Sequence, residues 1–216
     1  MPFKVKKQAY LTTSSASRKI TGWLQKLRAN SKHWKKLDLS EAALLVIDMQ
    51  NFFLDPEARG YVPSSPYVKE KVTQIIKKFK EQGRPIVYTT FASLSDKDPI
   101  LNWWENTISP DSKGADVELP EEHADLILRK ETYSAFLHTK LEEYLRSRGV
   151  KTIVITGVLS NLCCENTARA GFDRGFNVFF VMDATAAYNE DFHLATLLNL
   201  SYGVATPLTA SQIYDL

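Results

Sequence analysis

Three residues with reactive side chains occupy equivalent places in the chain, each at the end of a short apolar run. Asp48 closes Leu-Val-Ile-Asp, Lys130 closes Ile-Leu-Arg-Lys, and Cys163 follows Thr-Gly-Val-Leu-Ser-Asn-Leu. A carboxylate can take the proton of a neighbouring thiol, and an ammonium group or a helix N-terminus lowers a thiol pKa. The three together predict a nucleophilic unit with Cys163 as nucleophile, Asp48 as general base and Lys130 stabilising the thiolate. Taken singly, each has a structural interpretation, as a helix cap, a solvated lysine and a buried thiol.

The elements that must position these residues begin near residue 41, where β-rich runs alternate with amphipathic segments. Apolar spacing predicts strands at 43–48, 85–91, 125–128, 152–156, 178–182 and near 204, and helices at 66–82, 137–148, 161–174 and 191–202. This alternation predicts a single-domain α/β fold: a doubly wound, mostly parallel sheet of about six strands with helices on both faces. Ligands bind such sheets beyond the carboxyl ends of the strands, where Asp48, Lys130 and Cys163 fall.

Two further features concern the surroundings of this edge. Ser160 or Asn161 is expected to cap the helix that carries Cys163. The connection from about 92 to 124 is longer than connections in compact domains usually are, which is typical of a lid, and substrate specificity is expected to rest there. Aromatic residues near the three strand ends are candidates for an apolar pocket wall, each with core packing as an equally good interpretation: Phe53, Trp104, Tyr133 and Phe136.

Composition excludes several classes of protein. The 216 residues are 44% hydrophobic and 24% charged, as in a folded domain, and the longest apolar run, 42–47, is too short to span a membrane. The net charge of +2 gives no reason to expect a nucleic-acid partner. Residues 1–40 nevertheless carry ten Lys or Arg and one acid, +9, which leaves −7 for residues 41–216. We expect a basic N-terminal arm that lies over its own acidic domain or over a neighbouring subunit, anchored by apolar residues at near-helical spacing: Trp23, Leu24, Leu27 and Trp34.

Cysteine, histidine and glycine usage predicts no disulfide framework, no metal and no cofactor. The two cysteines, Cys163 and Cys164, are adjacent and poorly placed to bridge each other, so a reducing compartment is expected and Cys164 is interpreted as a small packed side chain. The histidines show no ligand spacing and are interpreted as surface or packed residues: His33, His123, His138 and His193. No Gly-rich phosphate loop follows the first strand. A cytoplasmic location follows, although the basic start leaves organellar targeting open.

Residues 41–216 resemble the isochorismatase-like hydrolase superfamily, in its cysteine hydrolase branch. The resemblance is carried by Gly-Val-Leu-Ser-Asn-Leu-Cys-Cys-Glu-Asn-Thr-Ala-Arg at 157–169, by Tyr-Ser-Ala-Phe at 133–136, and by Asp-Met-Gln at 48–50. It implies a Rossmann-like strand order, an Asp48, Lys130, Cys163 triad, and a cis peptide between Val158 and Leu159. That peptide would direct the Leu159 N–H, beside that of Cys163, at one oxygen as an oxyanion hole. The nicotinamidase branch binds a metal through Asp-x-His after the second strand, but residues 89–93 here read Thr-Thr-Phe-Ala-Ser.

The resemblance implies a cofactor-free hydrolase that cleaves a C–N bond of a small amide or carbamoyl (ureido) compound through a thioester, and a homo-oligomer, dimer or tetramer. Two alternatives stay open. Residues 7–10 and 99–104 resemble the isochorismatases proper, which hydrolyse a vinyl ether with the Asp and Lys and commonly lack the cysteine. The second alternative is a catalytically silent binding protein of the same fold that uses its arm for a partner.

Overall fold

The structure, a computed structural model, describes residues 5–31, 33–93, 99–104 and 107–216. Its strands are β1 (Ala42–Ile47), β2 (Ile86–Phe91), β3 (Leu126–Lys130), β4 (Thr152–Val158), β5 (Asn177–Ala186) and β6 (Thr206–Leu208). Its α-helices are α1 (Ala16–Asn30), α2 (Asn51–Leu54), α3 (Ser65–Glu81), α4 (Pro99–Trp104), α5 (Leu141–Ser147), α6 (Glu165–Asp173), α7 (Glu190–Gly203) and α8 (Ala210–Tyr214). Short 3-10 turns η1 (Leu39–Glu41), η2 (Lys113–Ala115) and η3 (Glu121–His123) and a π-helical turn η4 (Ser160–Cys164) complete the set.

The six strands form one parallel sheet in the order β3-β2-β1-β4-β5-β6. Every residue of β1, β2 and β4 is buried, as expected for parallel strands covered on both faces. The edge strand β3 alternates between exposed and buried positions toward its end. The predicted α/β class and the Rossmann-like strand order are confirmed.

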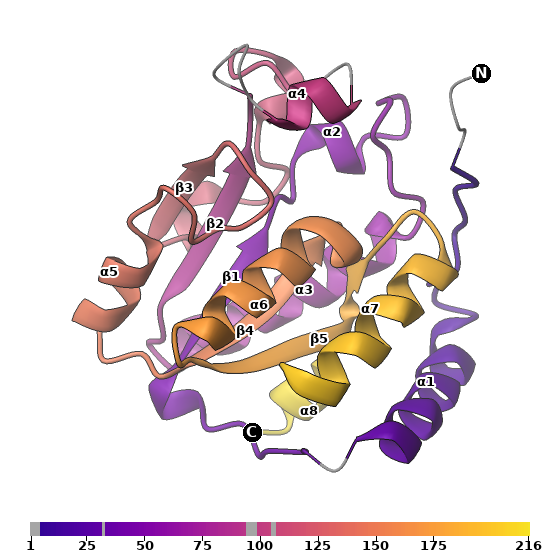
Figure 1. Cartoon of the computed structure of the whole chain (residues 1–216), viewed down its shortest axis with the longest axis vertical. Coiled ribbons are helices and arrows are strands. Elements are labelled where there is room, and N and C mark those ends of the chain that lie inside the picture. Colours follow the sequence, from indigo (N-terminus) through magenta and orange to yellow (C-terminus); the bar gives the residue numbers. More distant parts are fainter. Residues whose placement is uncertain (1–4, 32, 94–98, 105–106) are drawn as a thin grey trace.

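Helices cover both faces of this sheet (Figure 1). Helix α3 buries its apolar stripe, which includes Val72, Ile75 and Phe79, against β5, β4 and β1, and α8 packs beside it. On the opposite face lie α6 and α7, and α1 packs on the outside of α7. The crossover helices bring every strand into the sheet in the same direction, so all carboxyl ends meet at one edge.

The segment before β1 contributes to the same core as the sheet. Trp23 and Leu27 of α1 are buried, and so are Tyr10 and Leu11 ahead of it. The arm therefore lies over its own domain, in the first of the two placements that its charge and apolar anchors suggested. Lys35 extends the contact by donating a hydrogen bond to Asn177 Oδ1.

Several predicted boundaries differ from the structure for local reasons. Helix α4 lies within the connection that was predicted to be a loop, and residues 94–98 and 105–106 of that connection lie outside the described residues. The fifth helix begins at Leu141 rather than near 137, because His138 takes a positive φ of 57°. No helix in the described part of the chain is long and apolar enough to cross a membrane.

Candidate active site

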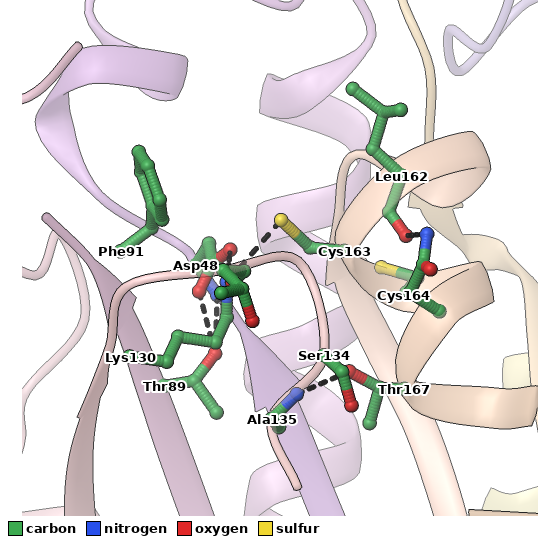
Figure 2. Close-up of polar contacts among 12 residues, drawn as sticks. Asp48, Thr89, Phe91, Lys130, Ser134, Ala135, Leu162, Cys163, Cys164 and Thr167 are labelled. Atoms are coloured by element: carbon green, nitrogen blue, oxygen red, sulfur yellow. Dashed lines mark hydrogen bonds and ion pairs between the residues drawn. The ribbon is translucent and has the colours of Figure 1, made fainter. Parts of the chain in front are cut away.

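The carboxyl edge of the sheet brings Asp48, Lys130 and Cys163 together (Figure 2). Asp48 follows β1, Lys130 ends β3, and Cys163 lies in η4 beyond the end of β4. The Lys130 Nζ lies 2.7 Å from Asp48 Oδ2 and donates a hydrogen bond of 3.3 Å to Cys163 Sγ. All three side chains are buried, with 6% exposure at most. The ammonium group thus links the carboxylate to the thiol.

A glycine lets β4 approach the end of β1 closely enough for this arrangement. Gly157 pairs with Ile47 and has a φ of 104°. A Cβ at this position would lie 2.0 Å from Ile47 O, which no side chain tolerates. Asp48, the next residue after Ile47, has a φ of 50°, and Asp is one of the few non-glycine residues that adopt this region readily.

Three neighbours of the triad were not predicted. Thr89 Oγ1 donates a 2.6 Å hydrogen bond to Asp48 Oδ1, which fixes the carboxylate. The carbonyl of Thr132 accepts a 2.9 Å hydrogen bond from Lys130 Nζ, and the ring of Phe91 lies 5.2 Å from the same atom. The contacts of Thr89 and Phe91 arise because both residues lie on β2, between the strands that carry Asp48 and Lys130. Strand adjacency was the only signal that could have indicated them.

Burial and neighbouring charges decide the protonation states. Burial lowers the pKa of Lys130, but Asp48 and Cys163 outweigh that effect, so its pKa is raised and it stays an ammonium ion. Burial raises the pKa of the Cys163 thiol, and the charge of Asp48 raises it further, against the lowering effect of Lys130. The expectation of a lowered thiol pKa was therefore wrong, because desolvation and the carboxylate outweigh the ammonium ion. The resting cysteine is a neutral thiol, and it could act as a nucleophile only after giving its proton to a base.

The turn that carries Cys163 continues directly into α6. Its first N–H groups belong to the start of a helix, where N–H donors lack intrahelical acceptors. The peptide bond between Val158 and Leu159 is cis, at the position that the resemblance implies. The predicted cap was wrong: the N-cap is Leu159, with no side-chain cap, and the Ser160 hydroxyl instead forms a 3.0 Å hydrogen bond with His193 Nδ1.

The expected pocket aromatics lie in different surroundings. Phe136 packs against Phe176, with ring centroids 5.8 Å apart, and under the guanidinium of Arg174. That places Phe136 in the core beneath α6 rather than at the triad, because Ala135 N–H bonds to Thr167 Oγ1 and turns the chain toward the helix.

Phe53 is also buried, with its ring against Phe52. Trp104 is 40% exposed and donates a 2.7 Å hydrogen bond to the hydroxyl of Tyr133. This pair joins α4 to the loop after Lys130. Of the four predicted pocket aromatics, Trp104 and Tyr133 are therefore the two that could border an opening to the buried Lys130.

Another aromatic residue near the thiol, Tyr188, was missed. Burial raises its pKa to about 12, and the nearby Cys163 acts in the same direction. Lys7 lies over its ring at 4.4 Å and donates hydrogen bonds to the carbonyls of Arg59 and Tyr61. The N-terminal arm therefore reaches the loop beside the triad.

No group of three or more His, Cys, Asp or Glu side chains in the described residues is placed to hold a metal ion. At the end of β2, where the resemblance would place an Asp-x-His pair, the structure has Phe91, Ala92 and Ser93. The donor set present does not fit that metal site.

Comparison with known proteins identifies the family and the fold. A family model described as Isochorismatase domain matches residues 42–212. Nicotinamidase 3 of Arabidopsis thaliana is 39% identical over 172 residues, 76% of this chain and 82% of that protein. The crystal structure of a cysteine hydrolase from Pseudomonas syringae pv. phaseolicola has a TM-score of 0.78 at 23% identity, covering 84% of this chain and 96% of that one. N-carbamoylsarcosine amidase from Thermoplasma acidophilum has a TM-score of 0.68 at 27% identity, covering 79% and 96%.

Proposed function

Since this chain belongs to the isochorismatase family, we propose that it is a cysteine hydrolase that cleaves a C–N bond of a small amide or carbamoyl compound through a thioester. The observation that carries the proposal is the buried chain of contacts from Asp48 through Lys130 to Cys163, at 2.7 and 3.3 Å. The similar proteins named nicotinamidase and N-carbamoylsarcosine amidase support the same substrate class.

In the first half of the reaction, Asp48 accepts the thiol proton and the sulfur of Cys163 attacks the carbonyl carbon of the substrate. The electron pair of the C=O bond moves to oxygen, which the N–H groups of Leu159 and Cys163 stabilise. Lys130 keeps its proton and holds the carboxylate in line with the sulfur. Collapse of the tetrahedral adduct breaks the C–N bond, and the leaving amine or ammonia takes the proton from Asp48.

In the second half, water gives a proton to Asp48 and its oxygen attacks the thioester. The C–S bond breaks, the sulfur recovers the proton from Asp48, and the acid product leaves. The raised pKa of the Cys163 thiol supports this order, because a neutral thiol needs the base before each attack. The chain's own residues therefore suffice for every proton transfer.

The test measures alkylation of the thiols by iodoacetamide from pH 5 to 9, with mass-spectrometric assignment, and then ammonia release from a panel of primary amides and ureido compounds. Cys163 should react in preference to Cys164, which is fully buried, and Asp48→Asn should slow the reaction. Cys163→Ala should abolish ammonia release, whereas the matched control Cys164→Ala should retain it. Equal alkylation of the two thiols, or turnover by Cys163→Ala, would contradict the proposal.

A second candidate function, vinyl ether hydrolysis, is favoured by the name of the matching domain and by the presence of Asp48 and Lys130 without a metal-ligand set. That reaction needs a proton donor and no sulfur nucleophile. Under this candidate, Cys163→Ala retains turnover of isochorismate while Asp48→Asn abolishes it, which separates it from amide hydrolysis. An inert Cys163 together with no turnover of either substrate class would leave a binding protein.

A further inference from the structure

A second buried polar group adjoins the turn that carries Cys163. His193, on α7, is fully buried, and its two ring nitrogens each meet one partner at 3.0 Å, Ser160 Oγ and the carbonyl of Met182. A carbonyl oxygen only accepts, so Nε2 carries the proton. In the neutral ring Nδ1 is then an acceptor, and the Ser160 hydroxyl donates to it.

The ring is held in this neutral form by its surroundings. Burial lowers the pKa of His193 to about 4, against the weaker opposing effects of the Met182 carbonyl and of Glu190. The charged group facing it, Glu190, is already engaged by an ion pair with Lys19 and by a 3.1 Å hydrogen bond from Trp23 Nε1. The direction of the Ser160 bond is therefore the same throughout the neutral pH range.

The N-terminal arm closes this site from outside. The ring of Trp23 lies 4.9 Å from that of His193, and the ring of Tyr10 lies 5.5 Å from it. The hydroxyl of Tyr10 accepts a 2.9 Å hydrogen bond from the N–H of Ala187, at the end of β5. Trp23 and Tyr10 thus pack against the imidazole ring that meets Ser160.

We infer that His193, clamped by the N-terminal arm, is a positioning residue for the nucleophile and acts through the hydroxyl of Ser160. Ser160 is the first residue of the turn whose fourth residue is Cys163. The turn has no side-chain cap, so the Ser160–His193 bond is the side-chain hydrogen bond that fixes its start. This inference rests on the proposed function and assigns the arm a part in it.

The experiment compares two substitutions that each keep one half of the ring's hydrogen bonding. His193→Asn places an oxygen near the Nδ1 position and keeps an acceptor for Ser160. His193→Gln places a nitrogen near the Nε2 position and keeps only the donor to Met182. Positioning predicts that His193→Gln lowers kcat and the alkylation rate of Cys163 by about 10- to 100-fold with little change in KM, because small displacements of a reacting group have effects of this size.

His193→Asn should stay within about fivefold of wild type, the loss of a single neutral hydrogen bond. A purely structural role predicts the reverse order, because Asn leaves the larger cavity and should unfold at the lower temperature. The two roles are therefore separated by ranking the two His193 variants twice, once by the reactivity of Cys163 and once by thermal stability. In the double variant, His193→Gln should add nothing to Ser160→Ala if both act through one hydrogen bond.

The inference is overturned if Cys163 reacts equally in the two His193 variants, if reactivity follows thermal stability, or if the effects of Ser160→Ala and His193→Gln add. Alkylation needs no substrate, so its outcome is independent of the proposed reaction. Alkylation rates in the predicted order, with no hydrolysis of any amide, would support the positioning role and contradict the proposed function.

Discussion

Two buried polar centres share the turn η4, one through Cys163 and the other through Ser160, and they differ in charge. The first, Asp48 with Lys130 and Cys163, contains a full ion pair with no exposed side-chain surface on either member. The second, Ser160 with His193 and the Met182 carbonyl, contains only neutral groups at hydrogen-bond distances. In the reaction that we propose, a proton moves within the charged centre, and the neutral centre only holds the turn that carries Cys163.

The difference is one of free energy as well as of chemistry. A buried ion pair carries a large desolvation penalty, which excellent geometry must offset, so it is weak evidence for stability and consistent with the reactivity that we propose. A fully satisfied neutral network rigidifies the structure without uncompensated charge. Substitutions in the first centre should therefore affect both stability and activity strongly, and those in the second should affect activity through geometry.

Breaking the ion pair should have the largest effect. Asp48→Asn leaves the Lys130 ammonium buried without a counter-charge, which should lower the free energy of unfolding by about 3–5 kcal/mol and abolish hydrolysis. Lys130→Met should lower it similarly. The double variant should recover much of that stability and none of the activity, as measured by urea unfolding and ammonia release. Equal losses that simply add in the double variant would contradict a strongly coupled pair.

The pH dependence of stability should separate a buried neutral base from a buried acid. The pKa of His193 falls from 6.5 to about 4 on folding. Its contribution to the free energy of unfolding is therefore complete above pH 6.5 and is lost as the pH falls toward 4. Asp183, whose pKa burial raises from 3.8 to about 6, contributes most below pH 3.8 and loses that contribution as the pH rises through 6. Each effect is about 3 kcal/mol.

Unfolding curves from pH 4 to 7.5 provide the measurement. As the pH falls from 7.5 to 4, the His193→Asn variant should lose less free energy of unfolding than wild type. The Asp183→Asn variant should lose more than wild type over the same range. Variants whose curves run parallel to that of wild type would show that neither group titrates differently in the folded and unfolded states.

A smaller effect is expected at Trp23, which packs against the ring of His193. Trp23→Phe keeps an aromatic ring against His193 and removes the indole N–H bonded to Glu190, so the free energy of unfolding should fall by about 1 kcal/mol. Alkylation of Cys163 should change little. Glu190→Gln, which keeps an acceptor for the indole, is the matched control. A large fall in reactivity with Trp23→Phe would mean that the Glu190 bond, and not the packing of the ring, holds His193.

The smallest effect is expected from an exposed charge on α6, the helix that follows the turn carrying Cys163. Arg169 pairs with Glu165 at 2.7 Å, but the arginine side chain is 46% exposed. Arg169→Ala should lower the free energy of unfolding by about 0.5 kcal/mol or less and leave Cys163 alkylation unchanged. A loss comparable with that of Lys130→Met would show that proximity to the turn, rather than burial, determines the importance of a charge.

The sequence was most informative where geometry follows from topology. Asp48, Lys130 and Cys163 were predictable because the carboxyl ends of parallel strands share an edge, and alternating strands and helices predict such a sheet. Thr89 was not predictable in the same way, because its role depends on which strand lies between β1 and β3.

Sequence patterns do not indicate which side chains far apart in the chain will contact each other. His193 was expected to be a surface or packed residue, and it is buried, but nothing in its spacing indicated the bond to Ser160, 33 residues earlier. Phe136 failed as a pocket residue because periodicity does not tell whether an aromatic side chain turns toward a site or under a helix. The arm was predicted from charge and apolar spacing, but no local sequence pattern indicated that it would pack against α7.

The docking of α1 on α7 has a consequence for the order of events during synthesis. Lys19 and Trp23 bind Glu190, a residue 171 and 167 positions later in the chain. At ~5–20 residues per second, a ribosome needs about 9 to 34 s to make that interval. During this time the apolar face of α1 lacks its partner helix α7, and the nine net positive charges of residues 1–40 keep the emerging segment hydrated and self-repelling. Helix α1, which is made before every strand of the sheet, thus reaches its final position only after α7 has been made.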